Sequence, residues 1–202
     1  MSSIKLKHAS GNSMSIAAPA TNPASDLSLK LPATIGSAGE VLQNSTTAGT
    51  LEMGSPFRPA FSAYCSATYD IAADTYVSAL NQTEVFDTDN AYNTSTSIFT
   101  VPANMGGAYQ VNGGVSVDDI NDGTYCAIAL YVDGAAHDPG GYFQLSYSPT
   151  ADRVVTANLS TCIKLTAGQT VQLKVRHNST GTQASENYCN YFSMFRLGGV
   201  AT

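Results

Sequence analysis

Apolar and polar residues alternate with a period of two along most of the chain from Ala60 onward. Such runs recur about every ten residues, the spacing typical of a β-sandwich or a β-barrel. Helical periodicity is essentially absent, so the pattern predicts an all-β fold. The strands are expected at residues 60–68, 75–77, 84–86, 98–100, 107–117, 124–132, 142–147, 154–164, 170–177 and 188–197.

Two Asp-Gly steps mark turns between predicted strands. The first closes residues 118–123 and the second is Asp133-Gly134. Because Asp-Gly between alternating runs is typical of tight hairpins, we expect a hairpin at each step.

Two of the strands are uncharged on both faces. In residues 125–131, Cys126, Ile128 and Leu130 share one face, and the residues between them share the other. A strand that is apolar on both faces is covered on both sides, so one face packs in the core and the other meets something outside the domain. Residues 191–195 follow the same logic. The predicted subunit interface comprises Tyr125, Ala127, Ala129, Tyr131, Tyr191, Phe192 and Phe195.

The first 54 residues differ in character from the rest. Short alternating stretches at residues 4–7, 14–16 and 27–31 are separated by prolines and glycines. Strands this short and few are marginal alone, so we expect residues 1–54 to be an extended anchor segment that docks onto other proteins. Pro56 and Pro59 mark the boundary with a head domain at residues 55–202. The predicted anchoring side chains are Ile4, Leu6, Leu27, Leu29, Leu31, Val41 and Leu42.

Composition narrows the classes of function. Charged residues make up 12% of the chain and hydrophobic residues 43%, so the chain can bury a core beneath a largely uncharged surface. The net charge is −6 and the nine Lys and Arg residues are scattered, which argues against nucleic-acid binding. No run reaches the roughly 18 consecutive apolar residues of a membrane span. Residues 1–12 lack the apolar centre of a signal peptide, so we expect synthesis in a cytoplasm without general secretion.

The cysteines and histidines show no catalytic or metal-binding spacing. Four cysteines occur without a CxxC pair, and a chain folded in the cytoplasm is expected to keep them reduced. We expect Cys126 and Cys189 to be buried. Of the possible pairs, Cys65 with Cys189 is the best candidate for a disulfide. The three histidines form no HExxH motif, and no GxSxG elbow occurs, so we expect a protein that is not an enzyme and has no cofactor.

A turn rich in carboxylates leaves one metal hypothesis open. Asp118, Asp119 and Asp122 could supply oxygen ligands to Ca²⁺. Calcium takes about six to eight oxygens, so a solvated turn is the favoured interpretation unless a three-fold axis gathers more ligands.

From Pro59 to Gly198 the order of motifs resembles the C1q/TNF-like domain. The stretches that carry the resemblance are Ala60-Phe61-Ser62-Ala63, Val85-Phe86-Asp87, Asn90-Ala91-Tyr92-Asn93, Phe99-Thr100-Val101-Pro102, Gly107-Ala108-Tyr109-Gln110-Val111, Leu130-Tyr131-Val132-Asp133-Gly134, residues 165–173 and residues 190–198. The resemblance implies a ten-stranded jelly roll that assembles as a tight homotrimer. The collagen-like repeat found upstream in secreted animal members is absent.

Residues 4–54 resemble a different group. The stretches 28–32, 36–42 and 49–54 are similar to a leader of tailed-phage virion proteins, notably of marine phages, where the leader precedes a variable C-terminal domain. The resemblance implies a virion protein assembled in the bacterial cytoplasm. It would be a homotrimer bound to other virion proteins through residues 1–54, acting as a short tail fibre or tip that binds a host receptor. A capsid decoration protein and a secreted C1q-like binding protein are the alternatives, and a tail glycan hydrolase would need paired carboxylates in a groove.

Overall fold

The computed structural model describes the chain in several stretches. These are residues 3–7, 11, 13–17, 21, 28–45, 47, 49–54, 58–120, 123–138, 141–147 and 153–199. Contacts divide the chain into two units, residues 1–54 and 55–202, the boundary expected from the sequence. Each unit is described separately below.

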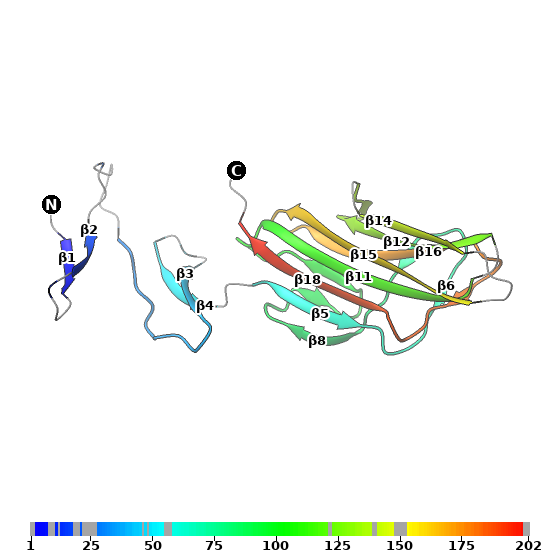
Figure 1. Cartoon of the computed structure of the whole chain (residues 1–202), viewed down its shortest axis with the longest axis horizontal. Helices are drawn as coiled ribbons and strands as arrows, with labels where there is room; N and C mark the ends of the chain where they lie inside the picture. The colour runs from blue at the N-terminus through cyan, green and yellow to red at the C-terminus, as the bar shows by residue number, and fades with distance from the viewer. Residues whose placement is uncertain are drawn as a thin grey trace. The chain divides into compact units, whose positions relative to one another are not determined.

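Residues 55–202 form the head, a sandwich of two antiparallel sheets (Figure 1). The described residues contain no helix, so the predicted all-β fold is confirmed. The five-stranded sheet consists, in spatial order, of β15 (Arg153–Leu165), β11 (Gly107–Ile120), β18 (Tyr191–Gly198), β5 (Ala60–Tyr64) and β8 (Thr83–Asp87).

The seven-stranded sheet faces it. Its main path runs through β13 (Ala135–Ala136), β12 (Thr124–Val132), β16 (Thr170–His177), β10 (Ile98–Thr100) and β9 (Tyr92–Asn93). β14 (Tyr142–Tyr147) also pairs with β12, and β7 (Val77–Ser78) with β16. A separate short pair joins β6 (Asp70–Ile71) to β17 (Gln183–Ala184).

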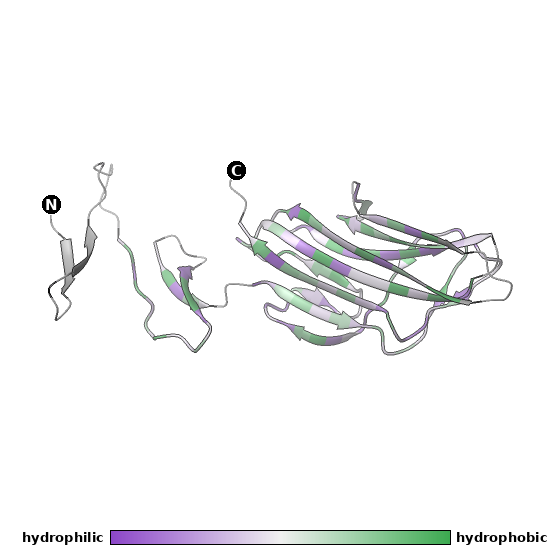
Figure 2. Ribbon diagram, viewed as in Figure 1, coloured by the Kyte–Doolittle hydropathy of each residue, from purple (hydrophilic) through white to green (hydrophobic). Residues whose placement is uncertain are grey.

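Alternation of side chains produces this sandwich. Colouring by hydropathy shows hydrophobic residues separated by paler or polar ones along the strands (Figure 2). In β12, Cys126, Ile128 and Leu130 enter the core, as predicted. An aromatic cluster fills one part of the core, where the Phe61 ring stacks on Tyr92 with centroids 4.3 Å apart. Burial of such rings is the main stabilising contribution in a core of this kind.

The two Asp-Gly steps have different structures. Asp133 and Gly134 both have positive φ, 51° and 78°, and they join β12 to β13 as a two-residue hairpin, so this prediction is confirmed. The predicted hairpin at residues 118–123 is wrong, because β11 and β12 belong to different sheets. β11 already pairs with β15 and β18 on its two sides, which leaves no edge for β12. The chain therefore crosses between the sheets here, and buried Ile120 holds the crossing against the core.

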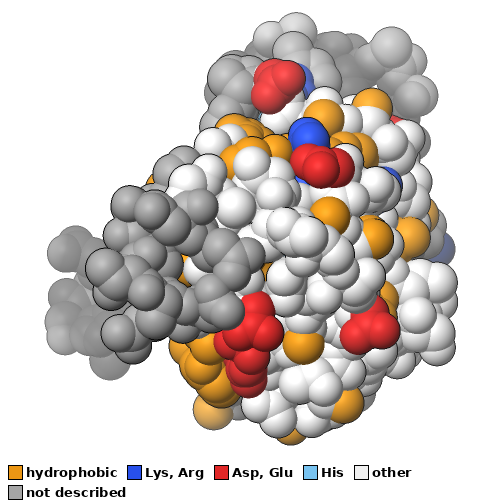
Figure 3. Space-filling view, turned by 90° about the vertical axis from the view of Figure 1, so that its right-hand side faces the viewer, with side chains coloured by type: hydrophobic (Ala, Val, Ile, Leu, Met, Phe, Trp, Pro, Cys, Tyr) orange, Lys and Arg blue, Asp and Glu red, His pale blue; other side chains and the backbone are white. Residues whose placement is uncertain are grey.

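The two ends of the head are distinct. β5 begins beside the end of β18, where Ala60 pairs with Phe195, and the Arg58 side chain forms an ion pair with Asp89 nearby. The opposite end carries the crossing after β11 and the segment between β16 and β18. Hydrogen bonds tie that end together, including Tyr69 N–H to Ser185 Oγ (2.9 Å) and Tyr125 N–H to Asn178 Oδ1 (2.6 Å). Figure 3 views this end, where most of the visible side chains are uncharged.

Residues 1–54 contain two small strand pairs. β1 (Ser3–Lys7) pairs with β2 (Ser13–Ala17), and β3 (Val41–Asn44) with β4 (Leu51–Gly54). The predicted strand at 27–31 does not form over its described part. Only Lys30 makes an isolated bridge, to Thr50, and Leu27 lies outside the described residues. Within the described ranges, we find no helix with the length and apolarity needed to cross a membrane.

Candidate assembly surface

The outer face of the five-stranded sheet is broad, uncharged over most of its area, and rich in aromatic side chains. We call it the five-stranded face. Its exposed apolar residues come from three neighbouring strands: Tyr64 of β5, Phe86 of β8, and Tyr191, Phe195 and Leu197 of β18. Strand register places Tyr191 opposite Tyr64 and Phe86 opposite Ser62, so these side chains form one continuous surface. Exposed apolar patches of this kind mark protein interaction sites.

The middle of the five-stranded face is polar but carries no charge. Gln110 Nε2 donates hydrogen bonds to Asn112 Oδ1 (3.2 Å) and to Ser160 Oγ (3.0 Å), and the Ser160 hydroxyl donates to Asn112 Oδ1 (2.9 Å). The three side chains come from paired strands, β11 and β15. Because these three side chains already bond to one another, covering this region costs less desolvation than covering unbonded polar groups would.

Phe192 was predicted to lie at the interface, and that prediction is wrong. Its ring is fully buried in the core and packs edge to face against Phe61. Tyr191 and Phe195, on the same strand, point to the opposite side and are exposed. Period-two geometry requires this division, since adjacent residues of a strand face opposite sides of the sheet.

The other half of the predicted interface lies on the second sheet. Tyr125, Ala127, Ala129 and Tyr131 line the outer face of β12 in the seven-stranded sheet. Ala127 lies between Gln144 and Arg176 on the adjacent strands, and Ala129 between Tyr142 and Lys174. Both alanines are buried within the single chain, so they need no partner subunit to cover them.

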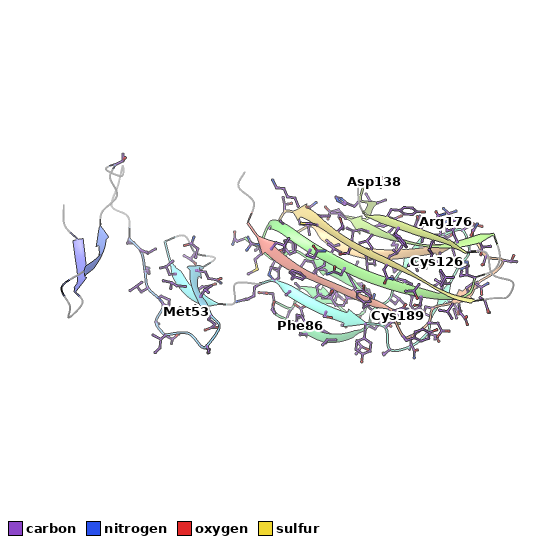
Figure 4. All side chains as sticks on the ribbon, in the orientation of Figure 1. Met53, Phe86, Cys126, Asp138, Arg176 and Cys189 are labelled. Atoms are coloured by element: carbon purple, nitrogen blue, oxygen red, sulfur yellow. The ribbon has the colours of Figure 1, made fainter. Side chains whose placement is uncertain are left out.

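The structure thus divides the predicted interface into two surfaces on opposite sides of the sandwich. Phe86 and Arg176, both labelled in Figure 4, come from strands of the two different sheets. Patches on opposite faces would link copies in line and produce an open chain, whereas a ring of three needs patches turned toward a common axis. A single closed interface cannot use both halves.

Three residues of the five-stranded face were missed from the sequence: Tyr64, Phe86 and Leu197. The sequence did place Phe86 in a strand, yet its facing could not be assigned. The register of β5 with β8 shifts between Ser62 and Ala63, and such a bulge changes which side chains face outward. Leu197 could have been found, because it continues the alternation of Tyr191 and Phe195.

The anchor residues that the structure describes are exposed. Leu29, Leu31, Val41 and Leu42 all expose a large part of their side chains, and Ile35, which was not predicted, is 98% exposed. An open cavity of about 460 Å³ lies among them, lined by Leu31, Pro32, Ala33, Thr34, Ile35, Gly36, Leu42 and Met53. The side chains of Ile4 and Leu6 lie outside the described residues, as does Leu27.

The calcium hypothesis gains no support from geometry. Asp118 accepts a hydrogen bond from the backbone N–H of Asp119, a local contact typical of a turn. Asp122 lies outside the described residues. Among the residues that the structure does describe, no group of three or more His, Cys, Asp or Glu side chains is placed to hold a metal ion.

All four cysteines are free in the structure. Cys65 and Cys126 are buried. Cys162 and Cys189 are exposed, so the predicted burial of Cys189 is wrong. Cys189 precedes β18 in a loop, with φ of 68°, whereas the sequence placed it inside the last strand.

The arrangement of sheets defines the head as a jelly-roll sandwich of the C1q/TNF type. The globular domain of zebrafish complement 1qA matches it with a TM-score of 0.50, at 15% identity, over 71% of this chain and 100% of that one. Eiger TNF from S. frugiperda matches with a TM-score of 0.50, at 16% identity, over 73% of this chain and 96% of that one. No family model and no curated protein matches the sequence. These similarities confirm the fold predicted from the motifs between Pro59 and Gly198.

Proposed function

We propose that the protein is a non-enzymatic structural component of a phage virion, displayed as a homotrimer whose residues 1–54 attach it to the particle. The observation that carries the proposal is the five-stranded face. Tyr64, Phe86, Tyr191 and Phe195 are exposed side by side on an uncharged surface. An uncharged surface rich in aromatic residues is the composition of subunit interfaces.

A second apolar patch completes a closed ring. Phe143 and Leu145 of β14, and Val154 of β15, are partly exposed where the edges of the two sheets approach each other. We call this the edge patch. The five-stranded face and the edge patch adjoin at β15, so the edge of one copy can pack on the face of the next. Contact between two different patches generates a ring when the rotation closes, and we propose a ring of three copies.

The anchoring role of residues 1–54 rests on their exposed apolar side chains. Leu31, Ile35 and Leu42 line an open cavity, and none of the core residues that the structure describes belongs to this segment. Exposed apolar side chains gathered in this way mark a site of interaction with another surface. The role as a short tail fibre or receptor-binding tip is supported by the end of the head opposite Ala60, where hydrogen bonds link neighbouring loops. A capsid decoration protein would use the same anchor and the same trimer.

Particle purification tests the proposal directly. The full-length protein should co-purify with phage particles through a density gradient and be detected there by specific antibodies. Labelling at the tail end supports the tip role, and labelling over the capsid supports decoration. Absence from purified particles would overturn the virion assignment, and a monomer at micromolar concentration in analytical ultracentrifugation would overturn the trimer.

A further inference from the structure

The outer face of the seven-stranded sheet carries a cluster of tyrosines and cations around the buried alanines of β12. The cluster consists of Tyr76, Tyr125, Tyr131, Tyr142, Lys174 and Arg176. The Tyr76 and Tyr131 rings lie 5.9 Å apart between centroids, and Lys174 Nζ lies 4.3 Å from the Tyr131 centroid. We call this the tyrosine–cation face, and it lies opposite the five-stranded face.

Two cations lie on one strand of a protein whose net charge is −6. Lys174 and Arg176 are two residues apart on β16, so they face the same side. Among the described residues Lys174 has no carboxylate partner, and its ammonium group lies over the Tyr131 ring. Of the other described cations of the head, Arg58 pairs with Asp89, Arg196 donates to the Gly106 carbonyl oxygen, and Lys164 lies on the other sheet. The tyrosine–cation face is therefore a local site for negative charge.

The chain itself shows how a carboxylate binds there. Asp74 Oδ1 lies 3.3 Å from Arg176 Nη2, and the Asp74 side chain is 69% exposed. An ion pair this exposed contributes little and exchanges readily with other partners. Asp74 is consequently a weak intramolecular competitor for any external carboxylate.

The tyrosines add flat rings and hydroxyl groups beside the cations. The Arg176 guanidinium carbon lies 5.8 Å from the Tyr76 centroid and 5.9 Å from the Tyr125 centroid, so the guanidinium group is held near two rings. Tyr142, which is partly exposed, donates a hydrogen bond to Gln144. Rings with a polar rim suit ligands that have one apolar face and many hydroxyl groups.

The backbone pairing of β12 argues against an extended peptide as the ligand of this face. β12 is hydrogen-bonded to β16 on one side and to β13 and β14 on the other. At β12, the centre of the site, an extended peptide therefore has no free strand edge to join. Recognition at this centre goes through side chains, on a broad face with small residues in its middle.

From the carboxylate position at Arg176, the free ammonium of Lys174 and the surrounding tyrosines, we propose that the tyrosine–cation face binds a carboxylate-bearing polysaccharide. The sugar rings stack on the tyrosines while the carboxylates contact Lys174 and Arg176. This inference is independent of the virion assignment and of the trimer, because it uses the opposite side of the sandwich.

Binding of polygalacturonate to the full-length protein, measured by titration calorimetry, tests the proposal. Lys174→Gln removes the charge and leaves a polar side chain one atom shorter, and we expect it to weaken binding about threefold to fivefold. Asp74→Asn removes the competing carboxylate and should tighten binding by a similar factor. Asn tolerates the positive φ of 56° at this position, so Asp74→Asn keeps the backbone intact.

The matched control is Lys164→Gln, which removes one positive charge from exposed Lys164 on β15 of the other sheet. It should leave binding unchanged, and neutral dextran should not bind the wild-type protein. Thermal unfolding of each variant, measured in parallel, verifies the fold. The proposal is overturned if polygalacturonate does not bind, if Lys164→Gln weakens binding as much as Lys174→Gln does, or if Asp74→Asn does not tighten it. Equal binding of dextran would also overturn it, since the anion would then play no part.

Discussion

The rings of Phe61 and Phe192 pack edge to face inside the sandwich, with centroids 4.9 Å apart and planes at 87°. They come from β5 and β18, which are neighbours in the five-stranded sheet although they lie at opposite ends of the head sequence. This contact joins the first long strand of the head to the last one. It also explains why only alternate aromatic residues of β18 are available to a partner.

Phe192→Ala and Phe195→Ala form a matched pair of substitutions on one strand. Phe192 is fully buried, so its truncation should lower the free energy of unfolding by about 3–5 kcal/mol. Phe195 is partly exposed, and its truncation should cost less than half of that in the isolated head. Urea denaturation of residues 55–202 at low protein concentration measures both. Equal losses would contradict the assignment of Phe192 to the core and Phe195 to the surface.

A charge placed on the five-stranded face should dissociate the trimer. Phe195→Asp puts a carboxylate between the uncharged strand neighbours Ala60 and Gln110, and a buried unpaired charge at an interface costs several kcal/mol. We expect monomers in sedimentation velocity experiments, with an unchanged circular dichroism spectrum. Gln144→Asp, on the opposite sheet, is the control and should remain trimeric. If both variants behave alike, the interface lies elsewhere.

Removal of residues 1–54 should leave a folded trimeric head that no longer joins the particle. The division between Gly54 and Ser55 separates two units, and the core cluster lies wholly in the second. Particle incorporation of the truncated and complete proteins, expressed in place of one another during infection, measures the effect. A truncated head that fails to fold would show that the segment contributes to the core.

Alkaline pH should destabilise the head in a defined window. Burial raises the pKa of the Cys126 thiol from 9.0 to about 12, and burial also raises the pKa of Tyr92 and of Tyr109 from 10.0 to about 12. A raised pKa in the folded state means that the folded protein favours the neutral form of the group. The stability that these groups contribute is therefore complete below pH 9 and is lost as the pH rises through 12. At pH 11 the titration of Cys126 alone should have lowered the free energy of unfolding by about 2–3 kcal/mol relative to its value below pH 9.

Urea denaturation between pH 8 and pH 11 measures this decline. Cys126→Ala removes the titrating thiol, so the free energy of unfolding of this variant should fall less steeply with pH than that of the wild type. Parallel curves for the two proteins would show that the Cys126 thiol does not contribute.

Thiol reactivity should divide the cysteines into two pairs. Cys162 and Cys189 are exposed, and Cys65 and Cys126 are buried. A thiol reagent should therefore react with two groups in the monomeric Phe195→Asp variant, because Cys162 lies beside Gln110 on the five-stranded face, and with four groups after denaturation without reductant. Two or no groups after denaturation would indicate disulfide bonds, in conflict with the prediction from the sequence.

Local alternation predicted most long strands well, because one face of each is buried. β10, β12, β14 and β16 have the predicted limits, and β11 and β15 differ at their ends. Very short strands such as β9 and β17 carry too few residues for a period to be recognised. The anchor strand predicted at 27–31 did not form in its described part, since alternation there has no core to face.

The assembly surface was only partly predictable, because a strand pattern shows which residues share a side and not which sheet the strand joins. Tyr125 and Tyr191 have similar patterns around them, yet their strands lie in different sheets. The pairing partners that decide this, such as Met194 with Phe61, are far apart in the sequence. The Asp-Gly step at residue 123 failed as a hairpin signal for the same reason.

The pairing of Ala60 with Phe195 determines where foreign peptides can be displayed on this head. A tag joined after Gly198 would emerge at the end of the head where β5 begins. A peptide inserted at Gly123 or Gly181 would instead project from the opposite end. Both glycines have positive φ and open space at the position of a Cβ atom, so the surrounding loops offer room for an insertion.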